Sequence, residues 1–288
     1  MNTTLFIKGG ITLSIVLIFT LASQLLFTPN TDSANQGDLV IMPRRVILDA
    51  RKRTQELNIA NSGSDSAKYL ISVVHYRMLE NGAFEEIFEP DSGQYFADKN
   101  FRFFPRSVTL GPNESQTIKV QSINTNELKA GEYRSHLYFR AVANEPSAED
   151  KAARLPKSVS VQLVPTFGTA IPVIIRNGST SAKINIEKPK LLWDANKAPQ
   201  VSMTFKRMGN ISVYGDLIIQ HITPSGKTTQ VGIAKGVAVY TPNKTRNITL
   251  NLDKNAAVDY HKGKLNIVFS TSGEPKTEVL ASSHIDLL

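Results

Sequence analysis

The sequence predicts an all-β protein built from two β-sandwich domains. Three observations favour this class: short β-rich runs recur along residues 37–288, turn residues separate them, and helical periodicity is missing after the N-terminal segment. The chain has 288 residues, and at roughly 150 residues per domain this length favours two domains. Apolar residues make up 41% and charged residues 20% of the chain, which is enough to bury a core.

The first 36 residues have the pattern of an export signal. Lys8 is followed by 17 uncharged, mostly apolar residues at 11–27, and then by a polar, turn-rich stretch. Two interpretations remain open at this length: a cleaved signal peptide, or an uncleaved signal anchor that forms an apolar helix. Either one sends the remainder of the chain across a membrane.

The first half of the mature chain contains about seven predicted strands. We expect extended segments at 39–48, 54–59, 68–78, 107–110, 117–122, 136–142 and 159–176. Turn signals such as Asn81-Gly82 and Gly111-Pro112 separate them. Strands of this number and spacing are typical of a sandwich of the immunoglobulin kind.

The second half repeats the style, with predicted strands at 201–205, 216–221, 230–234, 237–240, 246–252, 264–270 and 279–285. The polar stretch that begins at Asn177-Gly178 is the expected hinge. We therefore predict a signal segment at 1–36, a first domain at 37–177 and a second domain at 178–288.

The composition and motifs disfavour several function classes. Residues 37–177 hold 18 basic and 16 acidic side chains, and residues 178–288 hold 14 and 8. The excess of positive charge is in the second half, but it forms no basic run, so nucleic-acid binding is disfavoured. Cysteine is absent, the five histidines lack metal-ligand spacing, and nucleophile or phosphate-loop motifs are missing. We expect no catalytic residues, no metal and no cofactor, and hence not an enzyme.

The run at residues 158–176 is the most informative feature. Apolar side chains occupy every second position over much of it, among them Val159, Val161, Leu163 and Phe167. As a single strand it would span roughly 60 Å, much longer than a typical strand. Two ordinary core strands joined by a turn would also fit. The alternative is that part of the apolar row lies at a sheet edge and pairs with another chain.

Several segments in order resemble the periplasmic pilus-assembly chaperones of the PapD-like, chaperone-usher type. They are PRRVILDARKRTQELNIANSG at 43–63, FFPRSVTLGPNESQTIKV at 103–120, GEYRSHLYFRAV at 131–142, and the run ending IPVIIR at 171–176. The resemblance covers most of residues 38–177 and is looser over 178–288. It implies two immunoglobulin-like domains in a boomerang arrangement, and a divergent member of the family.

The resemblance also implies a function and a site. Such a chaperone acts in the periplasm, caps pilus or fimbrial subunits by donor strand complementation, and delivers them to an outer-membrane usher. Carried onto this sequence, Arg45 would bind the terminal carboxylate of the subunit, and Val159, Val161, Leu163 and Phe167 would be donor-strand side chains. Contact with the membrane would come only through an uncleaved N-terminal segment.

This chain departs from the family at one position that matters. The lysine usual in the last strand of the first domain falls at Pro172, and a proline side chain cannot bind a carboxylate. Arg45 would then act alone, another basic group such as Arg44 or Arg176 would replace the lysine, or the subunit would be anchored in a different way. In the family pattern Arg176 would instead pair with an acidic group near the domain interface, for which Asp259 is the candidate.

A second class of function stays open on the sequence alone. A membrane-tethered or secreted adhesion module could use two immunoglobulin-like domains for binding without a pilin client. In that case the row at 159–167 would be paired inside its own sheet.

Overall fold

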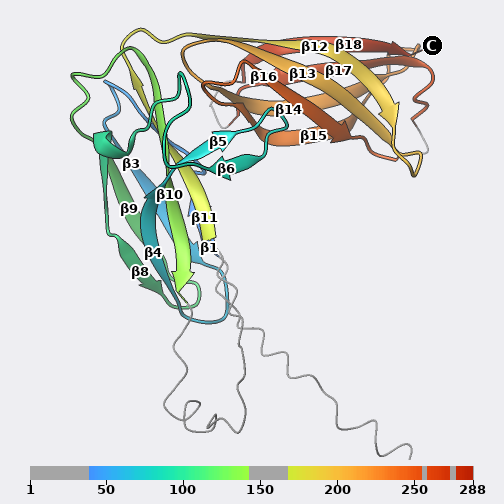
Figure 1. Ribbon diagram of the computed structural model, residues 1–288. Coiled ribbons are helices and arrows are strands. Elements are labelled where there is room, and N and C mark those ends of the chain that lie inside the picture. Colours follow the sequence, from blue (N-terminus) through green and yellow to red (C-terminus); the bar gives the residue numbers. More distant parts are fainter. Residues whose placement is uncertain (1–38, 143–167, 255–257, 273–276, 288) are drawn as a thin grey trace, which may run out of the picture. The chain divides into compact units, whose positions relative to one another are not determined.

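The computed structural model describes residues 39–142, 168–254, 258–272 and 277–287. Within these ranges the chain forms β-strands, their connecting turns and one short 3-10 helix, η1 (Asp98–Asn100). The strands form two β-sandwiches, which Figure 1 draws from blue to yellow for β1–β11 and from yellow to red for β12–β18. The predicted all-β class with two sandwiches is confirmed.

The first sandwich packs a four-stranded sheet, β1-β3-β9-β7, against a five-stranded sheet, β2-β11-β10-β4-β8. The bounds of these strands are β1 (Leu39–Met42), β2 (Val46–Leu48), β3 (Thr54–Asn61), β4 (Ala67–Val74), β7 (Phe101–Phe104), β8 (Ser107–Leu110), β9 (Ser115–Ser122), β10 (Gly131–Val142) and β11 (Gly168–Asn177). Alternate side chains point inward from both sheets. Fully buried residues such as Leu57 and Phe139 join the sheets in one apolar core.

Residues 39–48, predicted as one extended segment, form two strands in different sheets. β1 pairs antiparallel with β3, whereas β2 pairs parallel with β11. Pro43 lies in the bend between them, and a proline has no amide hydrogen with which to continue a ladder. The partner β2 covers β11 only at Val173–Ile175. In the described part of the chain, residues 168–172 therefore pair with β10 alone.

The second sandwich packs the sheet β12-β13-β16 against the sheet β15-β14-β17-β18. The bounds are β12 (Ala182–Trp193), β13 (Pro199–Gly209), β14 (Val213–Ile222), β15 (Thr228–Val239), β16 (Thr245–Asn251), β17 (Gly263–Ser270) and β18 (Val279–Leu287). Buried residues of both sheets, such as Phe205 and Phe269, form a second apolar core. In β14 every second side chain is buried, which is the period-2 pattern of a strand with one face in the core.

A small hairpin connects the two sandwiches. It consists of β5 (Tyr76–Met78) and β6 (Phe84–Glu86). The Asn243 side-chain amide donates to the Met78 carbonyl at 2.6 Å, and the Asn247 amide donates to the Glu80 carbonyl at 2.7 Å. These bonds fasten the hairpin to the loop before β16 and to β16 itself.

Two expectations for the second half were wrong. The strands predicted at 230–234 and 237–240 are one strand, β15, interrupted by a bulge rather than by a turn. The strand β12 was not predicted because Pro189, three lysines and one glutamate interrupt its alternation of apolar and polar residues. As an edge strand it tolerates both features.

Some expectations lie outside the described residues. These are the N-terminal apolar helix and the segment 143–167, which includes all four predicted donor residues. The domain limits at 37–177 and 178–288 stay predictions. Within the described ranges, no helix combines the length and the apolar character that a membrane span requires.

Candidate functional site: a cationic cleft beside an open strand edge

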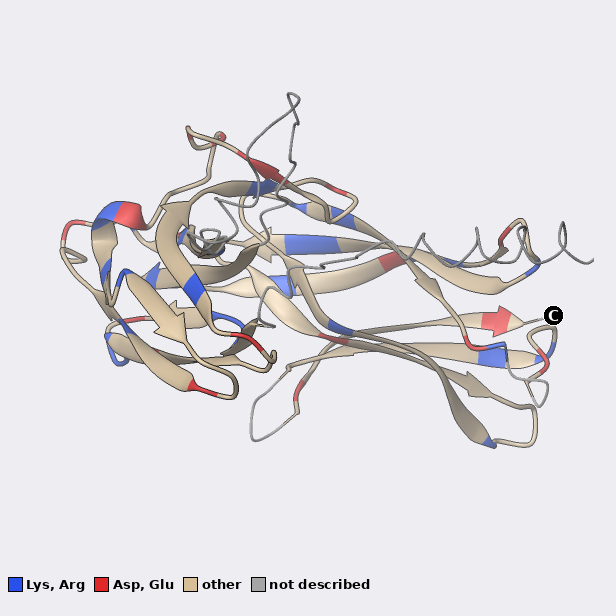
Figure 2. Ribbon diagram, turned by 90° about the horizontal axis from the view of Figure 1, so that it is seen from below, with Lys and Arg blue, Asp and Glu red and all other residues tan. Residues whose placement is uncertain are grey.

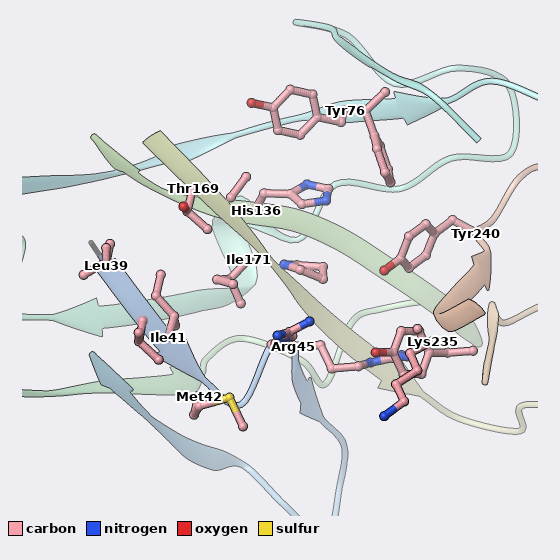
Figure 3. Close-up of a pocket in the computed structure, with 17 residues that line it drawn as sticks. Leu39, Ile41, Met42, Arg45, Tyr76, His136, Thr169, Ile171, Lys235 and Tyr240 are labelled. Carbon is pink, nitrogen blue, oxygen red and sulfur yellow. The ribbon is translucent and has the colours of Figure 1, made fainter. Parts of the chain in front are cut away.

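A cleft of about 780 Å³ lies beside the open end of β11 and is lined by residues of both sandwiches. Figure 3 shows Leu39, Ile41 and Met42 on one side of it and Lys235 and Tyr240 on the other, with Arg45 between them. Val40 and Met42 of β1 also line the cleft, and they are 46% and 55% exposed. An apolar wall thus faces solvent next to a strand edge that has no partner of its own among the described residues.

The sheet register places Arg45 at the end of a row across the sheet. Val46 pairs with Val173, so Arg45 comes one position earlier, level with Pro172. Pro172 in turn pairs with His136 on β10. All three residues line the cleft. The predicted carboxylate-binding arginine therefore lies immediately before the first residue of β2, level with the open edge of β11.

The guanidinium of Arg45 is held by an aromatic ring rather than by a carboxylate. It lies over the ring of Tyr214, 4.0 Å from the ring centre. Its Nε is buried and has no hydrogen-bond partner among the described residues. Burial lowers the pKa of Arg45, and the positive charge of Arg176 lowers it further, while Tyr240 and Glu132 act in the opposite direction. A partly desolvated cation without an anionic partner is suited to bind an anion.

The neighbouring histidine adds no charge to the cleft at neutral pH. His136 is 4% exposed and contacts the ring of Tyr76 edge-on. Burial, reinforced by Arg134 and His75, lowers the pKa of His136 to about 3. Its imidazole is therefore neutral, and it contributes an aromatic surface.

A second buried arginine supports the site from behind. Arg134 is 2% exposed, and its guanidinium lies 4.1 Å from the ring centre of Tyr240. Its Nη2 donates to the Tyr76 carbonyl at 3.2 Å. Burial lowers the pKa of Arg134 and raises that of Tyr240. Arg134 thus connects β10 to the hairpin and to Tyr240, the residue that follows β15.

Arg176 has a different role from Arg45. Its Nε lies 3.4 Å from Oε2 of Glu132, which is its cross-strand neighbour on β10. The same Glu132 oxygen accepts hydrogen bonds from the amide and the hydroxyl of Ser212, at 3.0 and 2.7 Å. Arg176 also donates to the Ser212 carbonyl at 3.3 Å. This network connects the first sandwich to the start of β14 and engages Arg176.

The expected pair of Arg176 and Asp259 is corrected by these contacts. The carboxylate of Asp259 lies 3.9 Å from the Lys262 ammonium and accepts from the His261 amide. Glu132 takes the place foreseen for Asp259, because it faces Arg176 directly in the β10–β11 register. The donor candidates Val159, Val161, Leu163 and Phe167 lie outside the described residues, immediately before the open end of β11.

Sequence reasoning missed three residues of the site: Tyr214, Tyr240 and Lys235. All belong to the second sandwich, more than 150 residues from Arg45 in the sequence. A signal was present at Lys235-Gly236, which interrupts two β-rich runs. The predicted strands at 230–234 and 237–240 leave a gap at this point, and the structure has a β-bulge there.

The described lining of the cleft carries only positive charge, whereas the sandwiches as a whole carry mixed charge (Figure 2). Figure 2 shows Lys and Arg segments spread along both sandwiches with Asp and Glu segments among them. The cationic residues that line the cleft are Arg44, Arg45 and Lys235, and its described lining contains no Asp or Glu. Within the described ranges, no cluster of three His, Asp or Glu residues is placed to hold a metal ion. The geometry fits binding of a chain end or another small anion next to an added strand.

No protein-family model matches the sequence, and no curated protein matches it. Among solved structures, the chain is similar to the YadV chaperone, with a TM-score of 0.42, 12% identity and coverage of 87% of this chain and 100% of that one. It is similar to a chain of the CsuC–CsuE chaperone–tip adhesion subunit complex from Csu pili of Acinetobacter baumannii, with a TM-score of 0.41, 12% identity and coverage of 85% and 98%. The class 5 fimbriae chaperone CfaA has a TM-score of 0.40, 14% identity and coverage of 87% and 99%.

Proposed function

We propose that this chain is a periplasmic chaperone that binds and caps a pilus or fimbrial subunit by strand addition and delivers it to an outer-membrane usher. In this proposal residues 37–177 form the subunit-binding domain and 178–288 the second domain. The role is binding and involves no catalysis. The observation that carries the proposal is the open edge of β11 at residues 168–172. It lies beside exposed apolar side chains and beside Arg45, whose buried Nε has no hydrogen-bond partner among the described residues.

The open edge supports strand addition because unpaired backbone groups are a template for another strand. β1 pairs with β3 in the other sheet, and after Pro43 only β2 pairs with β11, at Val173–Ile175. In the described part of the chain the edge at residues 168–172 is therefore not covered by its own sandwich. The exposed Val40 and Met42 offer apolar surface along the same groove. A subunit that lacks a strand could complete its own sheet there.

The proposed donor side chains precede this edge in the sequence. Val159, Val161, Leu163 and Phe167 precede β11 in the same alternating run. Burying four such side chains in a subunit would contribute about 6–12 kcal/mol before ordering costs. Arg45 would add a charge-assisted bond to the terminal carboxylate of the subunit, which fixes the register of the added strand.

Co-expression with a candidate fimbrial subunit, a small β-rich secreted protein, tests the proposal. We expect Arg45→Gln to lower the recovered complex by about tenfold or more, since a hydrogen bond to a charged group contributes about 1.5–3 kcal/mol. We expect Leu163→Glu to abolish recovery, because the glutamate would enter the apolar core of the subunit. Arg102→Gln is the matched control, since Arg102 is exposed on β7 and bonds only to Gln121 across the strand pair.

Circular dichroism and the melting temperature of each variant separate loss of binding from loss of folding. A folded Arg45→Gln variant that recovers as much complex as the wild type would refute the carboxylate site. A folded Leu163→Glu variant that does so would refute strand donation, and with it the chaperone proposal.

A further inference from the structure

The positively charged residues that line the cleft come from both sandwiches. Arg44 and Arg45 come from the segment between β1 and β2, whereas Lys235 comes from β15 of the second sandwich. The described lining contains no carboxylate that would neutralise them, and His136 is neutral because its pKa is lowered to about 3. An anion in the cleft would therefore meet positive charge from two separate elements.

A β-bulge places Lys235 toward the cleft. Gly215 pairs with Val237 and Leu217 pairs with Ala234, so Lys235 and Gly236 together oppose the single residue Asp216. Bulges re-aim a side chain relative to the regular alternation of a strand. The Asp216 carboxylate is engaged by the bulge itself, since its Oδ1 accepts from the Gly236 amide at 2.8 Å.

The same bulge is connected to Arg45 through one aromatic ring. Gly236 has a φ of +70°, and a Cβ at this position would lie 2.9 Å from the Tyr214 hydroxyl. A glycine is required there both for the left-handed backbone and for the close approach of Tyr214. Tyr214 in turn carries the guanidinium of Arg45 on its ring. The ring that carries Arg45 therefore also approaches the bulge that contains Lys235. Figure 3 shows Arg45 and Lys235 as neighbours in the lining of the cleft.

The other cations near the open edge are less suitable as a second ligand. The position level with Arg45 on β11 is Pro172, which offers no cationic group. Arg176 is engaged by Glu132 and Ser212. Arg44 is exposed and lies in the bend beside Pro43, where no described contact orients its side chain.

We propose that Lys235 is the second cation of the carboxylate site, so that the second sandwich takes part in binding the chain end of the subunit. This inference rests on the proposed function. In the bound state Arg45, from the segment before β2, and Lys235, from β15, both contact the terminal carboxylate. The ligand class is a peptide in extended conformation with a free C-terminus.

A pair of peptides tests this inference. The probe is a fluorescently labelled peptide of about ten residues, about 33 Å when extended, with alternating threonine and valine and a terminal phenylalanine. It is made once with a free carboxylate and once as the C-terminal amide. Fluorescence anisotropy gives the dissociation constant of each form for the wild type, Lys235→Gln, Lys235→Arg and Arg45→Gln. Lys227→Gln is the matched control, because Lys227 is an exposed lysine in the turn between β14 and β15.

We expect the wild type to bind the free carboxylate about tenfold or more tightly than the amide. Lys235→Gln should reduce this preference by about twofold to fivefold and leave the affinity for the amide unchanged, as expected for one charged contact at a solvent-exposed position. Lys235→Arg and Lys227→Gln should keep the preference.

An unchanged preference in Lys235→Gln would overturn the inference. If Arg45→Gln lost the preference in the same experiment, the proposed function would stand without a role for Lys235. A wild type that binds neither peptide, or binds both equally, would overturn the carboxylate site and count against the proposed function itself.

Discussion

The two halves of β11 differ in what covers their second edge. Residues 173–175 have β10 on one side and β2 on the other, and their side chains Val173, Ile174 and Ile175 are buried. Residues 168–172 have β10 on one side and, among the described residues, no strand on the other. One continuous strand thus has a structural half and a half that is available for pairing.

The cause of this difference is the change of sheet between β1 and β2. β1 pairs with β3 in the opposite sheet, and only the three residues of β2 return to β11. The arginines follow the same division, since Arg176 at the covered end has Glu132 as partner and Arg45 at the open end has an aromatic ring. The position of a residue along this one strand therefore decides whether its second edge is covered by the same sandwich or left open in the described part of the chain.

The largest expected effect comes from placing a charge in each half. Val173→Asp should lower the free energy of unfolding by about 3–5 kcal/mol, because an unpaired carboxylate would enter the core. Thr169→Asp, at an exposed position of the open half, should change it by less than about 0.5 kcal/mol. Urea unfolding of both variants gives these values. Equal destabilisation by the two substitutions would mean that the open half is packed as firmly as the covered half.

A smaller effect is expected at the covered end, where Glu132→Ala would leave Arg176 and Ser212 without their shared acceptor. We expect a loss of about 2–3 kcal/mol, less than for a fully buried pair, because the Arg176 side chain is 25% exposed. Glu187→Ala is the control, since its pair with Lys206 is exposed on both sides and should contribute less than about 1 kcal/mol. Thermal and urea unfolding measure both. If the two variants proved equally stable, the Glu132 network would not be a structural fastener.

The third prediction concerns the pH dependence of stability that is due to His136, the cross-strand neighbour of Pro172 in the open half of β11. His136 has a pKa of about 3 when folded and an ordinary value of 6.5. Between these values the unfolded chain binds a proton that the folded chain does not, so stability falls as the pH drops below 6.5. At pH 5 the loss amounts to about 2 kcal/mol. Unfolding measured from pH 7 to pH 4 should show a flatter profile for His136→Gln than for the wild type, and parallel profiles would contradict the burial of a neutral imidazole.

Much of the first sandwich was predictable from local pattern. The strand at 107–110 is β8 with the same bounds, and the strands expected near residues 54, 117 and 136 exist as β3, β9 and β10. Arg45 could be singled out because its surrounding motif resembles a known family. Period-2 alternation is a local property, so it survives in the sequence however the strands are later arranged.

The partners of the site residues were not predictable in the same way. His136, Glu132 and Arg134 occupy alternate positions of β10 and are polar, which suggests a solvent-facing side, yet all three are buried. Their burial depends on Tyr76, Ser212 and Tyr240, which come from other elements. No pattern within β10 contains that information.

The sequence by itself determined the all-β class, the positions of most strands and the basic character around Arg45, because these depend on residues close together in the chain. The tertiary structure decided that β1 and β2 divide between two sheets, that Glu132 rather than Asp259 meets Arg176, and that Lys235 shares a cleft with Arg45. These outcomes depend on strand register and on contacts between residues far apart in the chain. They are fixed only when the sheets and sandwiches pack.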